Sequence, residues 1–429
     1  MRFLVVGLLV SPLAWATSAD LAAVYQAAQA ANPTIQASQA SLNAARQDLI
    51  GADAALNPSV KLSATGAAGE LVVRDTDSAE GGYSSLSGTL SASLPLIAPT
   101  EQAAVALKRA SLSQAQVNSD STAAQLILDV ADAYFDSLSA KAQLGAAQAQ
   151  RSAVARQLEH AQQRLEVGLG TRVDVDRTQA SYDLAAVAEI RATDTLAQSF
   201  DRLEQLTGER YDTLADLSER YQTRGSQPGL DAVLDKVLSQ SAAMRAAQAG
   251  VDAARAGLAT ARAAQDYRVD AGASADSSKS LQGGRWNADY RVSVTLSMPL
   301  YTGGRNQASE AAAIAKLTAA QADLEATRRD LVRATRSLYR SIATQAQTVD
   351  ARMQAIRSAE TAVEATEGAY EVGSGDVIDV LNAQSDLFSA QSDFQIARYD
   401  HARLGLQLEQ LQGDLTVDDL STLNRSLTP

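Results

Sequence analysis

The stretch Val292-Ser-Val-Thr-Leu-Ser-Met-Pro-Leu300 alternates apolar and polar residues, and Leu90-Ser-Ala-Ser-Leu-Pro-Leu96 shows the same pattern earlier in the chain. A period of two places the apolar side chains on one face of a β-strand and the polar side chains on the other. The prolines of the two stretches are 204 positions apart (299 − 95 = 204). Because a repeat of this kind reflects a repeated architecture, the whole chain is best interpreted as two related halves.

Each of these strands has a second alternating run upstream, at 60–66 and at 269–275. The sequence therefore predicts two β-hairpins, with polar loops at 70–82 and 276–284. Each run approaches the roughly 9–11 residues of a tilted strand that crosses a bilayer. Aromatic residues, which favour membrane–water boundaries, stand near the strand ends, namely Tyr83, Trp286, Tyr267 and Tyr301. The pattern favours a sheet in lipid, although two soluble hairpins packed on helices would also alternate.

Four strands cannot enclose a barrel, and open sheet edges are not tolerated in lipid. Closure therefore requires several copies of the chain. Two copies would give about eight strands filled by their own side chains, and three would give about twelve strands around a channel. The small polar residues of the inward face favour the open version.

Two long segments, 100–167 and 307–372, contain no proline and almost no glycine. At about 1.5 Å per residue each would form a helix on the order of 100 Å long. Such a length predicts coiled coils or a helical tube, and the apolar seam follows the 3–4 spacing of a coiled coil. The seam residues are Val154, Leu158, Ala161 and Leu165, with Ala359, Val363, Thr366 and Tyr370 at the equivalent positions of the second half (359 − 154 = 205).

Each long arm ends at a glycine-bearing turn, 166–171 in the first half and 371–376 in the second. Glycine stops one helix, and the pairs Thr171/Asp174 and Asp376/Asp379 resemble capping boxes that start the next. Asp174 and Asp379 are then helix N-terminal carboxylates favoured by the helix dipole. They could also point into a constriction, and the two interpretations are compatible.

Composition excludes several classes of function. The net charge of −13 argues against a nucleic-acid partner. The absence of cysteine removes disulfides, thiolate metal sites and a cysteine nucleophile. We find no nucleophile–base set, metal-ligand cluster or phosphate-binding glycine loop, so the sequence predicts no enzyme activity and no cofactor.

Residues 1–19 have the pattern of a secretory signal, with Arg2 before a short apolar run and small residues at the end. Cleavage could follow Ala16 or Ala19, and we favour Ala19. The remaining chain divides into a first repeat (20–208), an equatorial segment (209–229), a second repeat (230–412) and a C-terminal equatorial segment (413–429). We expect the two equatorial segments to lie together around the middle of the helical rod.

An ordered series of short motifs closely resembles the TolC family of outer-membrane exit ducts. The motifs are Asp20-Leu-Ala-Ala-Val-Tyr25 with Asn32-Pro33, Ala131-Asp-Ala-Tyr-Phe135, Val167-Gly168-Leu169 with Asp174-Val175, Gln205-Leu206-Thr207-Gly208, Met298-Pro299-Leu300-Tyr301-x-Gly303-Gly304, Tyr370-x-Val372-Gly373 with Asp379-Val380-Leu381, and Leu411-Gln412-Gly413-Asp-Leu415.

This resemblance implies an α+β membrane protein in the bacterial outer membrane that extends into the periplasm. It implies a homotrimer, with a twelve-stranded β-barrel continued by a long α-helical coiled-coil barrel. The implied function is a passive exit duct for small molecules, secreted proteins or both. A periplasmic adaptor and an inner-membrane transporter of the RND, ABC or MFS type would recruit it. The alternative from another class is a periplasmic coiled-coil scaffold without a pore.

The resemblance also implies roles for residues at the turns. Adaptor docking falls on Val167, Gly168, Leu169, Val372, Gly373 and Ser374, and the gate or constriction on Asp174, Tyr370, Asp379, Asn382 and Arg172. Two positions depart from the family pattern, since Gly375 replaces a frequent arginine tether and Asn382 replaces a possible second acidic ring. Because Gly375 has no side chain, we expect Arg172 to supply the cationic tether.

Overall fold

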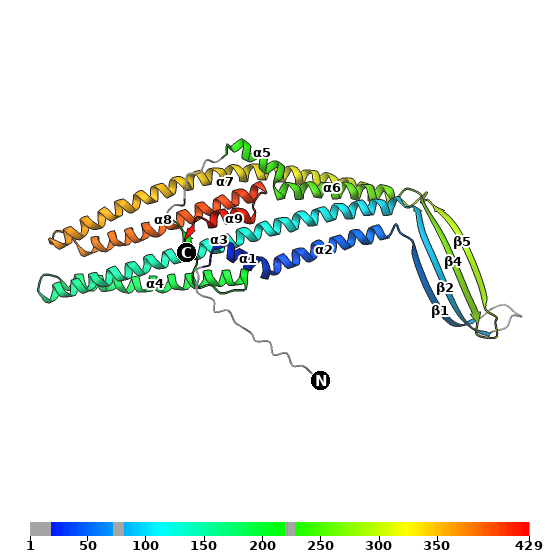
Figure 1. Cartoon of the computed structure of the whole chain (residues 1–429), viewed down its shortest axis with the longest axis horizontal. Helices are drawn as coiled ribbons and strands as arrows, with labels where there is room; N and C mark the ends of the chain where they lie inside the picture. The colour runs from blue at the N-terminus through cyan, green and yellow to red at the C-terminus, as the bar shows by residue number, and fades with distance from the viewer. Residues whose placement is uncertain (1–18, 72–80, 219–220, 222–227, 429) are drawn as a thin grey trace, which may run out of the picture. The chain divides into compact units, whose positions relative to one another are not determined.

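The computed structural model describes residues 19–71, 81–218, 221 and 228–428. The predicted signal segment up to residue 18, most of the first hairpin loop and part of the segment 209–229 lie outside the described residues. In chain order the elements are α1 (Leu21–Ala31), α2 (Pro33–Ala54), β1 (Ser59–Leu71), β2 (Gly81–Ile97), α3 (Pro99–Glu166), α4 (Arg172–Thr207), β3 (Asp216–Leu217), α5 (Leu230–Gln240), α6 (Ala242–Ala263), β4 (Arg268–Ser280), β5 (Asn287–Ser297), α7 (Arg305–Glu371), α8 (Val377–Gln412), α9 (Val417–Asn424) and β6 (Leu427–Thr428) (Figure 1).

The chain forms two compact units. The first is helical and contains described residues from 19–36, 120–242 and 329–428, whereas the second carries the sheet and contains 37–71, 81–119 and 243–328. The long helices α3 and α7 contribute residues to both units. With 68 and 67 residues, α3 and α7 confirm the predicted arms, and each is about 100 Å long.

The strands of the sheet unit pair antiparallel in the order β1-β2-β4-β5 (Figure 1). Over most of the sheet the register places apolar residues beside apolar ones and polar residues beside polar ones, because residues paired across strands share a face. Lys279, which pairs with Leu86, is an exception. One row of neighbours is apolar, with Val60, Ala92, Ala273 and Val292, and the adjacent row is polar, with Lys61, Ser91, Ser274 and Arg291. The alternation predicted from the sequence is therefore confirmed.

Strand β4 is longer than predicted. The sequence placed a loop at 276–284, but β4 continues to Ser280; residues 276–280 pair with β2, and residues 276–278 also pair with β5. The Asp276 carboxylate accepts hydrogen bonds from the Thr89 hydroxyl at 2.6 Å and the Ser274 hydroxyl at 3.2 Å. Neighbouring strands on both sides supply backbone partners, so a composition typical of a loop is compatible with a strand here.

Ion pairs connect the sheet to the helices of its own unit. Arg268, the first residue of β4, contacts Asp270 at 2.7 Å and also Glu101 in the first turn of α3. Arg262 of α6 pairs with Glu310 of α7 at 2.9 Å. The junction between strands and helices is thus held by charged side chains on several elements.

The core of the helical unit surrounds aromatic residues of α3 and α8. Tyr134, Phe135 and Tyr399 are buried, and Phe135 stacks on Tyr399 with ring centroids 5.9 Å apart. The Tyr134 hydroxyl donates to the Ala215 carbonyl at 2.6 Å, and the Tyr399 hydroxyl donates to the Asp216 carboxylate at 2.7 Å. Strand β3, which contains Asp216, pairs with β6. This pairing brings the segments 209–229 and 413–429 together as expected.

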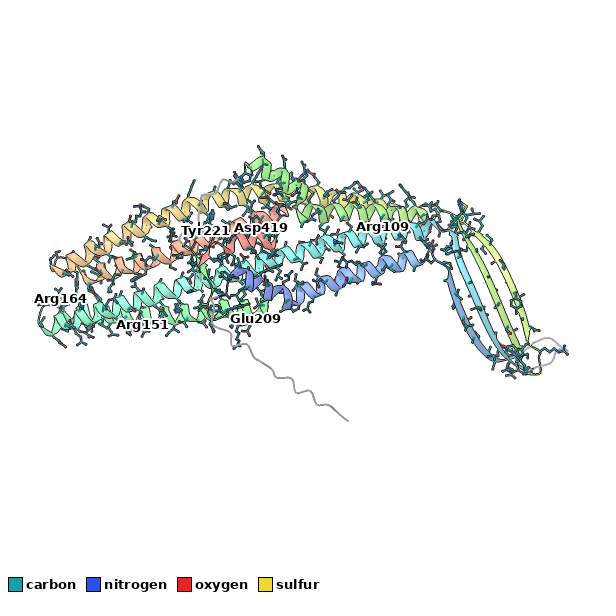
Figure 2. The ribbon with its side chains drawn as sticks, in the orientation of Figure 1. Arg109, Arg151, Arg164, Glu209, Tyr221 and Asp419 are labelled. Carbon is teal, nitrogen blue, oxygen red and sulfur yellow. The ribbon has the colours of Figure 1, made fainter. Side chains whose placement is uncertain are left out.

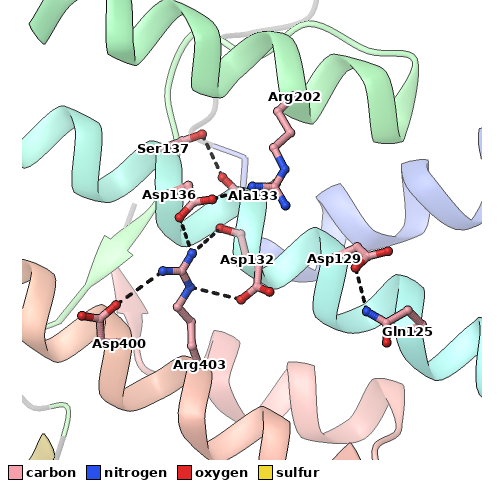
Figure 3. A network of polar contacts seen from close by, with 9 residues as sticks. All are labelled: Gln125, Asp129, Asp132, Ala133, Asp136, Ser137, Arg202, Asp400 and Arg403. Carbon is pink, nitrogen blue, oxygen red and sulfur yellow. Dashed lines mark hydrogen bonds and ion pairs between the residues drawn. The ribbon is translucent and has the colours of Figure 1, made fainter.

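A charged network joins α3, α4 and α8 beside this core (Figure 3). Arg403 of α8 contacts the carboxylates of Asp132 and Asp136 on α3, with 3.1 Å to Asp132, and Arg202 of α4 reaches Asp136 at 2.7 Å. Burial raises the pKa of the Asp132 carboxyl, while Arg403 opposes the shift. The Arg403 guanidinium therefore joins α3, in the first half of the chain, to α8, in the second half.

Candidate functional site

The two turns at the ends of the arms have the same backbone structure. In the first, the Leu169 and Gly170 N–H groups donate to the Arg164 carbonyl at 2.8 and 3.0 Å. In the second, the N–H groups of Ser374 and Gly375 donate to the Ala369 carbonyl at 2.9 and 3.0 Å. The turns are therefore equivalent across the internal repeat.

Gly168 and Gly373 adopt the left-handed backbone region, with φ of 74° and 76°. An added Cβ at either position would meet nothing within 4 Å. A larger residue would therefore be strained by its backbone conformation and not by contact with neighbours. Both turns are open at these two glycines.

The side chains beside these glycines are apolar and exposed. Val167, Leu169 and Val372 retain 69%, 72% and 80% of their accessible surface. The Ser374 hydroxyl donates to the Ala369 carbonyl at 3.1 Å, so it supports the turn. Apolar groups exposed on a loop are typical of contact sites for other proteins.

Asp174 has the predicted capping role at the start of α4. Its carboxylate accepts from the Thr171 N–H at 3.0 Å, and the Thr171 hydroxyl accepts from the Asp174 N–H at 3.2 Å. The second turn is simpler, since the Asp376 side chain accepts from the Ile378 N–H at 3.2 Å. Asp379 is exposed, one turn from the exposed Asn382 on the same face of α8.

Arg164 and Arg177 join the two turns. The Arg164 guanidinium lies 4.8 Å from the centre of the Tyr370 ring and donates to the Tyr370 carbonyl at 3.3 Å (Figure 2 labels Arg164). Arg177 of α4 pairs with Asp376 at 3.5 Å. Arg172, which we expected to be the tether, pairs instead with Asp176 on its own helix at 3.1 Å.

Sequence reasoning missed Arg164 and Arg177. The sequence assigned the cation to Arg172, at the start of the helix after the first turn, because Gly375 in the second turn has no side chain. The available signal was the position of Arg164 one turn before Gly168, equivalent to Ala369 in the second half (369 − 164 = 205). A cation present in one repeat only is suited to an asymmetric contact between the two.

Among the described residues, no group of three or more His, Asp or Glu side chains is placed to bind a metal ion. Within the same residues, no helix has both the length and the hydropathy of a membrane-spanning helix.

Comparisons with known proteins cover nearly the whole chain. The family model described as outer membrane efflux protein matches residues 24–209 and 233–414. The outer membrane protein TolC of Vibrio cholerae serotype O1 is 32% identical over 427 residues, which cover 97% of this chain and 95% of that protein. The alkaline protease secretion protein AprF of Pseudomonas aeruginosa is 32% identical over 236 residues, 53% of this chain and 48% of that protein.

The fold also matches solved structures. The outer membrane protein VceC of Vibrio cholerae superposes with a TM-score of 0.78 at 19% identity, over 92% of this chain and 96% of that protein. The matches to the family model and to the TolC protein set aside the scaffold without a pore. The chain belongs to the outer membrane efflux protein family and is a non-enzymatic TolC-like channel of the bacterial outer membrane that extends into the periplasm.

Proposed function

We propose that three copies of the chain close into a twelve-stranded barrel continued by a tunnel of helices. The observation that carries this proposal is the four-stranded sheet, whose outer strands β1 and β5 each have an unpaired edge among the described residues. Its apolar face is open, with Leu62 and Val292 at 76% and 86% exposure. In lipid such edges must be paired, and family members typically trimerise. Pairing β5 of one copy with β1 of the next meets this requirement.

The assembled chain acts as a passive exit duct for small molecules, polypeptides or both. A periplasmic adaptor and an inner-membrane transporter of the RND, ABC or MFS type recruit it. Support for polypeptide cargo comes from AprF, whose name describes alkaline protease secretion. Residues 1–19 are removed on export, and the repeats 20–208 and 230–412 supply equal shares of the tunnel. The recurring order of elements and the double match to the family model support this division.

The turns form both the adaptor-docking surface and the gate. The docking surface combines exposed apolar side chains with open glycines, which allow another protein to approach closely. It consists of Val167, Gly168, Leu169, Val372, Gly373 and Ser374. The gate is closed by contacts between the two hairpins. Arg164 on Tyr370 and Arg177 on Asp376 provide these contacts in one chain, and Asp174 fixes the start of α4 beside them.

Asp379 and Asn382 line the constriction. Three symmetry-related copies of Asp379 would form an acidic ring that attracts cations and slows anions. Asn382 adds no second charged ring, so block by multivalent cations should be weaker than in a channel with two rings.

Planar-bilayer recording tests this function. The wild-type protein should form channels that favour cations, and Asp379→Ala should reduce that preference. Asp183→Ala, an exposed acid on α4, serves as the matched control and should leave selectivity unchanged. Absence of wild-type conductance would contradict the duct, whereas equal selectivity in all three proteins would contradict only the role of Asp379.

A further inference from the structure

One cation of the sheet lies on its apolar face. Lys279 is near the end of β4 and pairs with Leu86 of β2. Because paired residues share a face, and every second residue of a strand does so too, Lys279 is on the face that carries Leu90. By contrast, Lys61 and Arg291 lie on the polar face, in the row that contains only polar neighbours. The position of Lys279 along its strand decides what it can meet.

Lys279 lies at the external boundary of the apolar band. It is eleven residues beyond Arg268, where β4 begins (279 − 268 = 11). At about 3.3 Å per residue and a strand tilt of about 35–45°, this distance spans about 26–30 Å across the membrane. The apolar band of such barrels is about 25 Å tall. Since β4 begins beside the periplasmic helix α6 and runs away from it (Figure 1), Lys279 reaches the level of the outer lipid headgroups.

An aromatic ring holds the cation at this level. The Lys279 Nζ lies 5.9 Å from the centre of the Trp286 ring. That ring is 57% exposed, and Tyr290 on the apolar face of β5 is also exposed. Indole and phenol rings favour the boundary between lipid and water, and a cation over an indole face is stabilised there. Lys279 and Trp286 thus form a fixed pair where headgroups and acyl chains meet.

A second cation adjoins this pair, and neither cation is neutralised within the chain. Arg285 is exposed in the turn before β5, directly beside Trp286 in the sequence. Among the described residues, Lys279 and Arg285 form no ion pair, whereas the arginines within the strands do. Glu70 is also on the apolar face, but it belongs to β1, which is not adjacent to β4. Two cations are therefore available to an anionic ligand.

We propose that Lys279, Arg285 and Trp286 bind the phosphate-bearing headgroup of a lipid in the outer leaflet, the class to which lipopolysaccharide belongs. The ammonium and the guanidinium would donate charge-assisted hydrogen bonds to phosphate oxygens. The acyl chains would lie on the apolar face beneath them, against Leu86 and Tyr290. Three copies would give three equivalent sites around the barrel. This inference rests on the proposed function, because the barrel must first close in lipid.

The apolar surroundings favour a lipid over a free phosphate ion. A ligand that joins phosphate to acyl chains gains contacts with the cations and with the exposed apolar face at once. A free phosphate ion gains nothing from Leu86 or Tyr290, and the exposed Lys61 on the polar face would serve it equally well. The site is therefore suited to a lipid that carries both groups.

Native mass spectrometry of the delipidated channel in detergent tests the proposal. The probes are lipid A with its phosphates and the same lipid after dephosphorylation. We expect the phosphorylated lipid to bind at least tenfold more tightly. Lys279→Gln combined with Arg285→Gln should abolish that preference. The matched control, Lys61→Gln with Arg291→Gln, removes the same two residue types from the polar face of the same sheet and should preserve it.

Further measurements separate charge from fold and lipid from ion. Lys279→Arg keeps the charge and should retain tight binding. Equal binding of the two lipids to the wild-type channel, or an equal loss in both double variants, overturns the proposal. Displacement of lipid A by millimolar inorganic phosphate would assign the site to the ion and also overturn it. Channel conductance in bilayers without lipid A reports separately on the duct: a conducting channel without lipid preference contradicts only this inference.

Discussion

Arg164 makes two kinds of contact between the two turns, a guanidinium over the Tyr370 ring and a hydrogen bond to the Tyr370 carbonyl. A cation–π contact at an exposed site contributes about 0.5–1 kcal/mol. Losing about 1 kcal/mol changes the ratio of closed to open channels roughly fivefold. Arg164→Ala should therefore raise the resting open probability several-fold in single-channel recordings.

Arg172→Ala is the matched control for Arg164→Ala. Both residues are arginines close to the first turn, but among the described residues the ion pair of Arg172, with Asp176, lies within its own helix. Arg172→Ala should therefore leave the resting conductance unchanged. If Arg164→Ala conducts like wild type, the contact with Tyr370 does not hold the gate.

Glu409 gives the helical unit a dependence on pH. Burial, followed by the charges of Asp419 and Asp414, raises the pKa of the Glu409 carboxyl to about 7, and Lys236 opposes the shift. A raised folded-state pKa means that the folded protein holds the proton more tightly. The resulting stabilisation is complete below the ordinary pKa of about 4.5 and is lost as pH rises toward 7.

Thermal unfolding in detergent at pH 5 and pH 8 checks this expectation. Wild type should melt at a lower temperature at pH 8. Glu409→Gln, which cannot ionise, should lose most of the difference. An unchanged difference in Glu409→Gln would assign the pH dependence to other carboxyls, such as Asp132.

At single residues, local interactions could be predicted from the sequence and tertiary contacts could not. The capping box of Thr171 and Asp174 depends on a spacing of three residues, and the structure contains it. Arg164 contacts Tyr370 across 206 positions, and no local pattern specifies that pairing. Arg172 was a plausible tether by position, but an acid four residues away on its own helix competes for it.

Among the elements, the ends of α4 and α8 are equivalent but differ in their surroundings. Gly208 and Gly413 both have left-handed backbones, with φ of 72° and 80°. A Cβ at position 208 would meet Ala31 at 3.7 Å, an ordinary contact, whereas one at position 413 would collide with the Gln240 carbonyl. Of these two helices, α8 therefore ends directly against α5, and α4 does not end against a backbone in this way.

Alanine at each position separates backbone strain from collision. Gly208→Ala should cost about 1–2 kcal/mol, the penalty of the left-handed region for a residue with a Cβ. Gly413→Ala should cost clearly more, because the Gln240 backbone must also move. The measurement is the free energy of unfolding in urea. Equal losses would show that the contact with Gln240 relaxes without cost.

The strands allow a test of which face meets lipid. Leu94 and Leu296 lie on the apolar face, and their neighbours Ser93 and Thr295 lie on the polar face. Arginine on a lipid-facing strand position costs about 2–4 kcal/mol near the midplane. Leu94→Arg and Leu296→Arg should therefore impair assembly in outer-membrane fractions, while Ser93→Arg and Thr295→Arg assemble. Equal defects in both pairs would contradict the assignment of faces.

Element types followed from periodicity more reliably than element ends. The alternation at 269–275 predicted β4, but its continuation through Asp276 to Ser280 depends on pairing with β2 and β5. Polar residues are typical both of a loop and of the water-facing side of a strand, so the composition of that stretch does not place the end of β4. The seam of the second arm was also less clear, since Ala359 and Val363 are half-buried whereas Val154 and Ala161 are buried.

For the whole molecule, the internal repeat carried most of the information. The offset of 205 positions (373 − 168 = 205) relates turns whose backbone hydrogen bonds are equivalent, and the proline-free segments predicted α3 and α7 nearly to their ends. The number of copies does not follow from one chain's contacts, because among the described residues β1 and β5 each pair with a strand on one side only. Closure is a property of the assembly.

Native mass spectrometry of the detergent-purified mature protein tests closure most directly. Three copies supply the twelve strands that leave a channel, so we predict a single species with three times the mass of the chain that begins near Asp20. Only monomers or dimers would contradict the account, because two copies would give a barrel of about eight strands filled by its own side chains.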